Sequence, residues 1–600
     1  INNCTVTQNI GGQAVSRVGG GSTNKKIINS IVWGNSSSID HVGGFDVSYS
    51  NIEDGYAGTG NINTDPGFVD LANSDYHLSD YSPSLGTGTL EGAPATDIEG
   101  NPRPNPAGSN PDMGAYESLK STRVTDTYYV MKSGNDQNNG SLSSPFLTIQ
   151  RGLDAGYHGD TVIVYPGKYE EDIDYKLKNI VLASRYLTTN DSTYRDNTVI
   201  QGTVHMVGLD STAALIGFMI YKNKVYVEDS SPVIKRLHIR EYNNSGALYI
   251  SNNSNLIIDD IEIRSNGNIN SGSYGGGILI TNSKLVLNNA IIDSNSTNSD
   301  GGGLYSRNSY ITINNSKIIN NVTNNDGGGI FSFEDTSYFM KGVYISGNKS
   351  STYGGGLYIS GTYNPVILTN LYVDQNVSET TRGGGIYSDN INLIISNSSS
   401  ITNNSAKNGG GIFYTSIDGD SLVINNTSFI NNHANNRGGA IDAYLTGSGG
   451  KVELTYVLFE KNTAGFHVLE IEPNTDNSYI QIVNNTFVRN DGGISTLRLY
   501  NRGENEFINN IVWHNTYSQS NITLGVPGKY NNIENYAGSL GEGSISLDPQ
   551  FVDLANGDYS LQPTSPSIDA GHPDLDGDGE TWETDKDDQD PDGTRMDMGS

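Results

Sequence analysis

Gly275-Gly276-Gly277-Ile278 is the first copy of a four-residue motif that returns along the chain. Further copies begin at Gly301, Gly327, Gly354, Gly383, Gly409 and Gly438, 26 to 29 residues apart, and the last reads Gly-Gly-Ala-Ile. Self-similarity at this period indicates stacked repeats, in which each unit contacts only its neighbours. The chain is therefore expected to form a solenoid rather than a compact globule.

A second mark keeps the same spacing: an apolar residue is followed three positions later by asparagine. Glycine and asparagine tolerate left-handed backbone, and stacked asparagine amides can bond to one another. We therefore interpret both marks as structural features of turns, not as ligand contacts. The asparagines are Asn266, Asn295, Asn321, Asn348, Asn376, Asn404, Asn432, Asn462 and Asn490.

Residues 301–326 show what one repeat builds. Three short pieces, around Leu304, Ile311 and Ile318, alternate apolar and polar residues between turns rich in Gly, Asn and Ser. This alternation is typical of half-buried strands. We predict an all-β chain folded as a parallel β-helix, with three strands in each coil of 26 to 29 residues. One file of inward residues consists of Ile278, Leu304, Ile330, Leu357, Ile386, Ile412 and Ile441.

Composition and charge narrow the range of functions. The chain carries 66 acidic and 35 basic side chains, a formal net charge of −31, which argues against nucleic acid as a partner. It has no apolar run of transmembrane length, so we expect no direct membrane insertion. The single cysteine, Cys4, excludes an internal disulfide framework.

Several segments occur twice, far apart in the chain. Residues 65–73 return at 548–556, residues 82–84 at 565–567, and Asp112-Met113-Gly114 at 597–599. We therefore expect a tandem array within a longer chain, of which this sequence covers two units. The expected parts are a first unit at 1–118, a linker at 119–127, a second β-helix at 128–530 and a truncated, loop-rich terminal region at 531–600.

The second unit opens with a predicted helix. Ser144 is expected to be its N-cap, Pro145 its first residue, and Gly156 lies near its end. A solenoid has to cover the unpaired edge and the bare core of its first coil. We predict that this helix is the cap. The apolar residues on its one face are Phe146, Ile149 and Leu153.

These features resemble a known group of proteins. The glycine-rich coils and the closing Ser-Pro-Ser and Asp-Met-Gly segments are similar to right-handed parallel β-helix proteins of bacterial surfaces and secretions, with a pectate-lyase-like fold. The terminal region resembles a choice-of-anchor domain. Gly438-Gly439-Ala440-Ile441, with Phe459 and Asn462, resembles the repeats of chlamydial polymorphic outer-membrane proteins. The resemblance implies an extracellular or bacterial cell-surface location but no single activity, because this fold hosts lyases, hydrolases, adhesins and stalks.

A row of aromatic residues follows the glycine motifs. If the Ile or Leu of the motif points inward, the next residue points outward. That position is aromatic in five successive coils, which predicts an exposed strip for stacking on the sugar rings of an extracellular polysaccharide or host glycan. The alternative is that the rings stack on one another and stabilise the sheet. The residues are Tyr305, Phe331, Tyr358, Tyr387 and Phe413.

Catalytic residues are harder to find. The polygalacturonase-type motif set of this fold is incomplete in the chain. A lyase would need clustered carboxylates beside a basic residue. The nearest candidates are His433, Arg437 and Asp442, with Asp418 and Asp420 one coil earlier. We therefore favour an adhesin, a stalk or a glycan-binding surface, with a polysaccharide lyase or glycoside hydrolase as the alternative.

The sharpest ion-binding pattern lies near the end of the sequence. From Asp574 to Asp585, carboxylates fall at loop positions 1, 3, 5 and 12, glycine at 6 and a backbone carbonyl at 7. This spacing can wrap a calcium ion with oxygen ligands, and Asp at position 12 resembles dockerin-type loops. We predict a structural calcium site, and a solvated acidic loop is the alternative. The residues are Asp574, Asp576, Asp578, Glu580 and Asp585.

Overall fold

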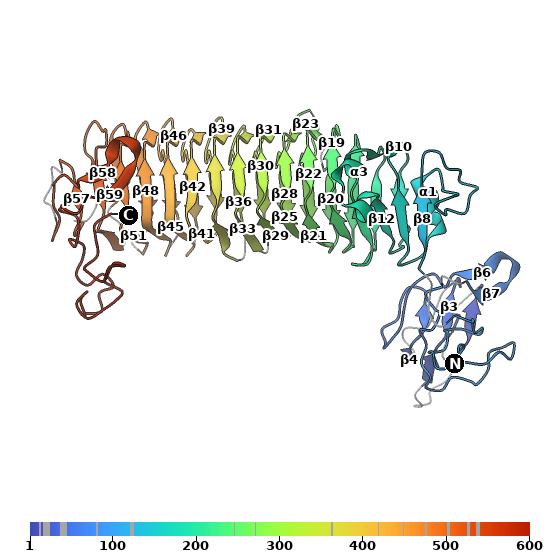
Figure 1. Cartoon of the computed structure of the whole chain (residues 1–600). Helices are drawn as coiled ribbons and strands as arrows, with labels where there is room; N and C mark the ends of the chain where they lie inside the picture. The colour runs from blue at the N-terminus through green and yellow to red at the C-terminus, as the bar shows by residue number, and fades with distance from the viewer. Residues whose placement is uncertain are drawn as a thin grey trace.

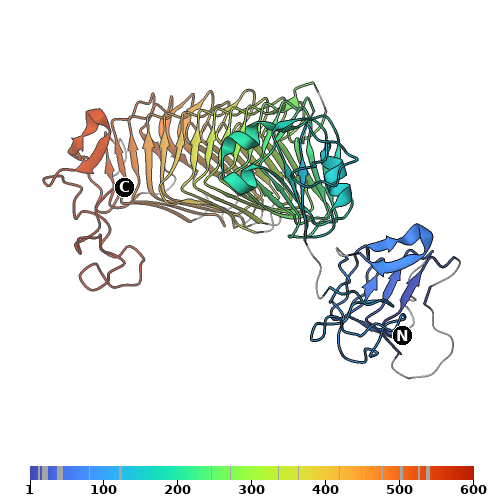
Figure 2. The same cartoon turned by 45° about the vertical axis from the view of Figure 1, so that its right-hand side comes forward.

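The computed structural model describes most of the chain. The described residues are 1–10, 14–15, 25–36, 45–79, 82–120, 125–244, 246–270, 272–335, 337–361, 364–417, 419–447, 449–474, 477–500, 504–524, 528–535 and 541–599. They form a right-handed parallel β-solenoid of about 18 turns, which confirms the predicted fold class. Figures 1 and 2 show the strands stacked along one long axis, with a smaller N-terminal body beside one end.

One coil illustrates the architecture. Strand β24 (Ile278–Thr281) is followed by β25 (Lys284–Asn288), β26 (Ile291–Asp293) and β27 (Ser296–Thr297). The first joins a 14-stranded sheet, the next two join a 28-stranded sheet, and the last joins an 8-stranded sheet. The coil therefore has four strands, and the prediction of three was wrong. The fourth strand is two residues long, too short to leave an alternating pattern in the sequence.

An asparagine ladder fixes one corner of the coils. Asn295 Nδ2 donates to Asn321 Oδ1 at 3.0 Å and to the carbonyl of Ile263 at 2.9 Å, and the same bonds recur at successive coils. The nine predicted ladder side chains are at most 1% exposed. Their structural role is confirmed. The left-handed residue, however, is the one before each ladder residue, such as Asn320 with φ 55°.

The glycine motif lies where the 8-stranded sheet leads into the 14-stranded sheet. Gly301 has φ 74°, a left-handed conformation that favours glycine. A Cβ on Gly302 would collide with the carbonyl oxygen of Gly328 in the next coil. The motif therefore combines the positive φ and the close backbone approach that its sequence predicts.

The core is a column of side chains one coil wide. Strand β28 (Leu304–Arg307) pairs in parallel with β32 (Ile330–Phe333), so that Leu304 lies beside Ile330. Every residue of the predicted inward file is 0% exposed. Burial of one such side chain contributes about 1.5–3 kcal/mol. The repeated file therefore supplies stability coil by coil.

A short helix covers the first coil. Helix α1 (Ile149–Ala155) has Thr148 as its N-cap and Gly156 as its C-cap. The predicted start at Pro145 was wrong, because Phe146 pairs with strand β8 (Thr127–Val130): its amide donates to the carbonyl of Tyr129, and its carbonyl accepts from the amide of Met131, just after β8. Of the predicted apolar face, Ile149 and Leu153 lie on α1 and are at most 1% exposed. Phe146 is equally buried but lies before the helix, so its place on the helix face was wrong. No helix among the described residues is long and apolar enough to cross a membrane.

The first unit and the end of the second share one arrangement. Asn51 Nδ2 donates to Ser84 Oγ at 3.1 Å, and Asn532 Nδ2 donates to Ser567 Oγ at 2.9 Å. Each unit also carries a short antiparallel hairpin (Figure 1). The repeated sequence segments thus build the same closure twice. The hairpin strands are β6 (Phe68–Asp70) and β7 (Asp75–Leu78), then β58 (Phe551–Asp553) and β59 (Asp558–Leu561).

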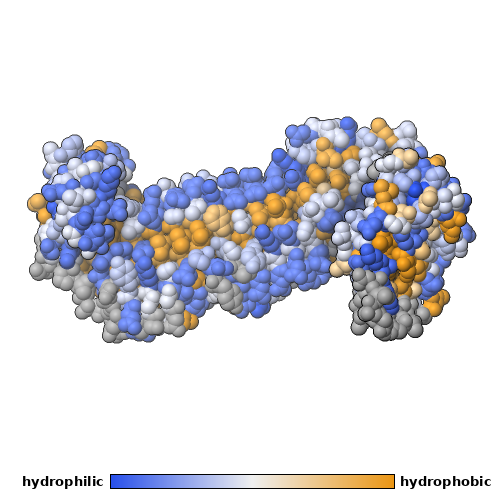
Figure 3. Space-filling model, turned by 90° about the horizontal axis from the view of Figure 1, so that it is seen from below, coloured by the Kyte–Doolittle hydropathy of each residue, from blue (hydrophilic) through white to orange (hydrophobic). Residues whose placement is uncertain are grey.

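A hydrophobic stripe runs along the underside of the solenoid (Figure 3). In β21 (Asn255–Asp259) and β37 (Val366–Thr369), the outward Ile257 and Ile367 are 58% and 36% exposed. Exposed apolar rows are common in contact surfaces. Strand register aligns the stripe residues Ile257, Val286, Thr312, Phe339, Ile367, Ile394 and Val423.

Candidate functional site

The five predicted aromatic residues form one continuous stack on the 14-stranded sheet. Neighbouring rings are nearly parallel, with centroids 4.6 to 5.5 Å apart. Their strands are in register, so each ring lies beside the ring of the next coil. The strands are β28, β32, β36 (Leu357–Ser360), β40 (Ile386–Asp389) and β44 (Ile412–Ser416). We call this row the closed aromatic file.

Side chains from neighbouring turns cover the closed aromatic file. Tyr274 lies 4.6 Å from Tyr305, and the Arg382 guanidinium lies 4.6 Å from the centre of Phe413. Tyr305 is 7% exposed and Phe413 1% exposed, and burial raises the pKa of Tyr305 to about 12. The rings point outward as predicted, but four of the five are at most 8% exposed and Tyr358 is partly buried, so the prediction of an exposed strip was wrong. Their faces are occupied by one another, as the stacking alternative requires.

Charged residues continue the closed aromatic file beyond Phe413. Register places Asp442 of β47 (Ile441–Leu445) beside Phe413, then Glu470 of β50 (His467–Pro473), then Arg498 of β53 (Ser495–Leu499). Asp442 and Glu470 are both 0% exposed. Neither oxygen of Asp442 has a hydrogen-bond partner among the described residues. Sequence analysis missed Glu470 and Arg498, although they follow Asp442 at two successive intervals of 28 residues.

Arginines balance these buried acids. Arg437 lies 3.6 Å from Glu470 Oε1 and 3.4 Å from Glu472 Oε2, and Tyr500 donates to Glu470 Oε1 at 3.3 Å. Burial raises the pKa of Asp442 to about 7, an effect that the nearby Arg437 opposes. The cluster is an ion network beneath the surface. A substrate would reach the carboxylates of this network only after the side chains that cover them had moved.

The structure brings only some of the predicted catalytic residues into this network. Of the predicted catalytic residues, the structure brings together Arg437 and Asp442. His433 instead lies in β46 (His433–Ala434) of the 8-stranded sheet, where its ring bonds to Thr463 and Asn435. The buried His467 takes the place expected of His433, with Arg498 3.3 Å from its Nε2. Burial and Arg498 lower the pKa of His467 to about 4. Asp418 lies outside the described residues.

An open row of side chains lies on the third strand of the coils, in the 28-stranded sheet. Tyr344 and Tyr372 stack with centroids 4.5 Å apart, and Tyr344 is 46% exposed. Register continues the row through Ser400 and Ser428, whose hydroxyls are 3.4 Å apart, to Leu458. We call this row the open track. Its strands are β34 (Tyr344–Ser346), β38 (Tyr372–Asp374), β42 (Ser399–Thr402), β45 (Ser421–Ile430) and β48 (Lys451–Glu460).

The open track ends in a hollow of about 520 Å³. Its lining, among the described residues, consists of uncharged hydroxyl and amide side chains with one leucine and one tyrosine. Tyr456, which is 45% exposed, stands at its edge and also lines a second hollow of about 510 Å³ beside the terminal region. The first hollow is lined by Ser398, Ser399, Asn425, Asn426, Thr427, Ser428, Tyr456 and Leu458.

A similar hollow lies nearer the first coils. It measures about 430 Å³ and combines Asn and Ser side chains with Lys284 and Tyr310, which is 49% exposed. An exposed ring beside amides and hydroxyls therefore occurs at two places along the solenoid. Sequence analysis found neither place, because these residues carry no repeated motif.

The predicted calcium loop brings several carboxylates together. Ligand oxygens of Asp576, Asp578 and Asp585 lie within 4.8 Å of one another, as do those of Asp574, Asp576 and Asp588. Four of the five predicted residues therefore contribute carboxylates to these groups, and Asp588 was missed. Glu580 was predicted through its backbone carbonyl, and its amide donates to Asp578 Oδ1 at 2.7 Å.

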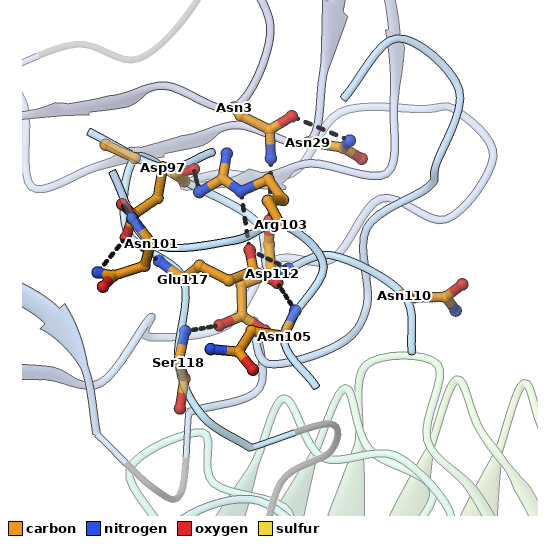
Figure 4. Close-up of polar contacts among 12 residues, drawn as sticks. Asn3, Asn29, Asp97, Asn101, Arg103, Asn105, Asn110, Asp112, Glu117 and Ser118 are labelled. Atoms are coloured by element: carbon orange, nitrogen blue, oxygen red, sulfur yellow. Dashed lines mark hydrogen bonds and ion pairs between the residues drawn. The ribbon is translucent and has the colours of Figure 1, made fainter. Parts of the chain in front are cut away.

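A buried polar cluster closes the first unit (Figure 4). Arg103 Nε donates to Glu117 Oε2 at 2.8 Å, with both side chains at most 1% exposed. Asp112 accepts from the amides of Gly86 at 2.6 Å and Ser118 at 2.7 Å. Burial raises the pKa of Asp112 to about 7. Every one of these contacts joins segments of the terminal region, so the cluster has a structural role.

Comparison with known proteins gives one family match within the chain. Residues 426–444 match the Chlamydia polymorphic membrane protein repeat, and these residues include Asn432 of the ladder and Asp442. The stacked coils decide the class, and this match agrees with it. The chain is a β-helix repeat protein. No curated protein matches this β-helix repeat protein in sequence.

Solved structures similar to this β-helix repeat protein include three carbohydrate-related chains. The pectate lyase Pel9A has a TM-score of 0.24 at 13% identity, covering 79% of this chain and 96% of that one. A rhamnogalacturonan lyase has a TM-score of 0.17 at 11% identity, with 73% and 95% covered. A complex of XylC with xylose has a TM-score of 0.20 at 11% identity, with 72% and 88% covered.

Proposed function

We propose that this protein is an extracellular, cell-surface β-helix that binds a neutral polysaccharide along the open track. The observation that carries the proposal is the uncharged hollow of about 520 Å³ with the exposed ring of Tyr456 at its edge. Sugar rings present apolar faces and many hydroxyls. An exposed tyrosine offers a surface for the faces, while serine hydroxyls and asparagine amides bond to the hydroxyls.

The shape of the open track suits an extended chain. Its residues repeat once per coil, about 4.8 Å apart, and so follow the long axis of the solenoid. Tyr344 and Tyr372 lead into Ser400 and Ser428, and Ser428 itself lines the hollow. The absence of charge from this lining favours a neutral polymer over an acidic one, because the chain as a whole carries a formal charge of −31.

The surface location rests on different support. Residues 426–444 match a repeat named for polymorphic membrane proteins of Chlamydia. The terminal closure, built twice in the same way, supports a tandem array that displays the solenoid as a stalk. The choice-of-anchor resemblance of that region adds an attachment role. A stalk of this kind would present the open track away from the cell.

Affinity electrophoresis of the whole chain through gels with neutral or acidic polysaccharides tests the proposal. We expect a neutral polymer to retard the protein, and Tyr456→Ala to weaken the retardation about tenfold, or ~1.4 kcal/mol. Tyr274→Ala is the matched control, because Tyr274 is also exposed (44%) but lies against the closed aromatic file. Equal retardation of the wild type and Tyr456→Ala would overturn the proposal.

Product release is scored in the same samples. New reducing ends or unsaturated sugars would replace the binding proposal with the lyase or hydrolase alternative. The candidate catalytic residues would then be the buried carboxylates Asp442 and Glu470 and their neighbour Arg437. The binding proposal expects retardation without release.

A further inference from the structure

The acidic loop is the main difference between the two copies of the terminal region. Gly88 donates to the carbonyl of Pro111, and Gly571 donates to the carbonyl of Met596 in the same way, at 2.9 and 2.8 Å. A small hairpin then follows in both copies, beginning at Thr96 in the first and Gln589 in the second. The loop from Asp574 to Asp588 lies between these shared points only in the second copy. The closure therefore forms without it, and the loop needs a separate explanation.

Asp588 supplies the observation that points to a ligand. Its side chain is 0% exposed, and its Oδ1 accepts from the amide of Leu575. Its Oδ2 has no partner among the described residues. The carboxylate lies within 4.8 Å of those of Asp574 and Asp576. A buried carboxylate with one oxygen left without a partner, beside two further acids, is strongly unfavourable unless a cation compensates its charge.

We propose that Asp574, Asp576 and Asp588 bind a calcium ion. Asp576 also belongs to the second carboxylate group, and the other two members of that group, Asp578 and Asp585, complete the ligand shell of the ion. All the ligands are carboxylate oxygens, which is the donor set of a hard divalent cation. The several ligands from one short loop suit the larger, flexible shell of calcium better than the strict octahedron of magnesium. This inference is independent of polysaccharide binding.

The ion would join the loop to the last coils of the solenoid. The loop starts beside His572, whose amide donates to Asn509 Oδ1 at 2.7 Å, and Asn509 belongs to the solenoid. It ends next to the hairpin whose Gln589 and Asp590 line, together with Tyr456, the hollow beside the terminal region. Calcium would therefore hold the residues on one side of that hollow in place. Removal of the ion would loosen the terminal region without unfolding the solenoid.

Terbium luminescence provides a direct test, because Trp582 lies within the loop. Excited tryptophan sensitises a nearby terbium ion, and terbium occupies calcium sites. We expect the whole chain to show saturable terbium emission that calcium displaces, and Trp582→Phe to lose the emission. Isothermal titration should still detect calcium binding by Trp582→Phe.

Substitution of single carboxylates identifies the ligands. Asp588→Asn and Asp576→Asn should each weaken calcium binding at least tenfold, measured by titration. Asp587→Asn is the matched control, because Asp587 is exposed and belongs to neither carboxylate group. Circular dichroism checks that each variant keeps its strands. An absence of saturable binding to the wild type, or equal binding by Asp588→Asn, would overturn the proposal.

Discussion

Two outward rows run along the same solenoid, and they differ in what surrounds them. In the closed aromatic file, five rings stack on one another and Tyr274 and Arg382 cover the ends, so that Phe413 is 1% exposed. In the open track, a pair of stacked tyrosines leads into small hydroxyl residues, and Tyr344 stays 46% exposed. Alternation along a strand sets the direction of a side chain. The neighbours one coil away, and the turns above them, decide whether water reaches it.

The largest expected effect comes from breaking the closed aromatic file. Phe413→Ala should destabilise the solenoid by about 3–5 kcal/mol, because it leaves a cavity between Tyr387 and Asp442. Chemical denaturation monitored by circular dichroism measures the change. Retardation by a neutral polysaccharide should remain that of the wild type under conditions where the variant is folded. A small loss of stability would show that the file is not a packed element.

The next effect concerns the charged end of the closed aromatic file. Asp442 has a pKa of about 7 instead of 3.8, because it is buried beside Glu470, and Arg437 only partly offsets this. The folded chain binds this proton more tightly than the unfolded chain, so stability falls as the pH rises from about 4 to about 7. Asp442→Asn should remove part of this fall and stabilise the protein by roughly 2–4 kcal/mol at pH 8.

Denaturation midpoints at pH 5 and pH 8 measure this difference. The variant should exceed the wild type by a smaller margin at pH 5 than at pH 8, because the fall in wild-type stability is only partly complete at pH 5. Glu472→Gln is the control, because Glu472 is only partly buried beside the same Arg437. A constant difference at both pH values would show that Asp442 is ionised throughout.

The smallest effect on stability is expected at the open track. Tyr372→Ala should change the free energy of unfolding by no more than about 1 kcal/mol, because the ring is only partly buried on the surface. It should nevertheless reduce retention on a neutral polysaccharide, in contrast to Phe413→Ala. Measuring both stability and retention for Tyr372→Ala and Phe413→Ala sharpens the distinction between the open track and the closed aromatic file. If both variants lost stability and kept retention, the open track would be a structural stack as well.

The repeated parts of the molecule could be predicted from the sequence, and the unrepeated parts could not. The glycine motif and the asparagine of the ladder each recur once per coil. A wrong register assigned to one coil would therefore have disagreed with the copies in all the others. Helix α1 was placed several residues early, because Ser144 and Pro145 are good helix starters but Phe146 pairs with β8 instead. Propensity yields to a strand partner that the local sequence does not reveal.

The site was predictable only in part for a related reason. Asp442 was noticed because it follows a glycine motif, whereas Glu470 and Arg498 follow none. The ligand spacing of the acidic loop identified four of its carboxylates, and Asp588 lies beyond the twelve positions of that pattern. Tyr456 and the asparagines of its hollow come together through the stacking of coils, which only the three-dimensional register shows.

Hydroxyl-radical footprinting with and without a neutral polysaccharide tests the central claim most directly. The open track should be oxidised at Tyr344 and Tyr456 in the free protein, since these are 46% and 45% exposed, and protected when the polymer binds. Tyr305 and Tyr387, at 7% and 8% exposure, should stay unmodified in both states. Oxidation of Tyr305 and Tyr387 in the free protein, with protection on binding, would contradict the account and return the polysaccharide to the closed aromatic file.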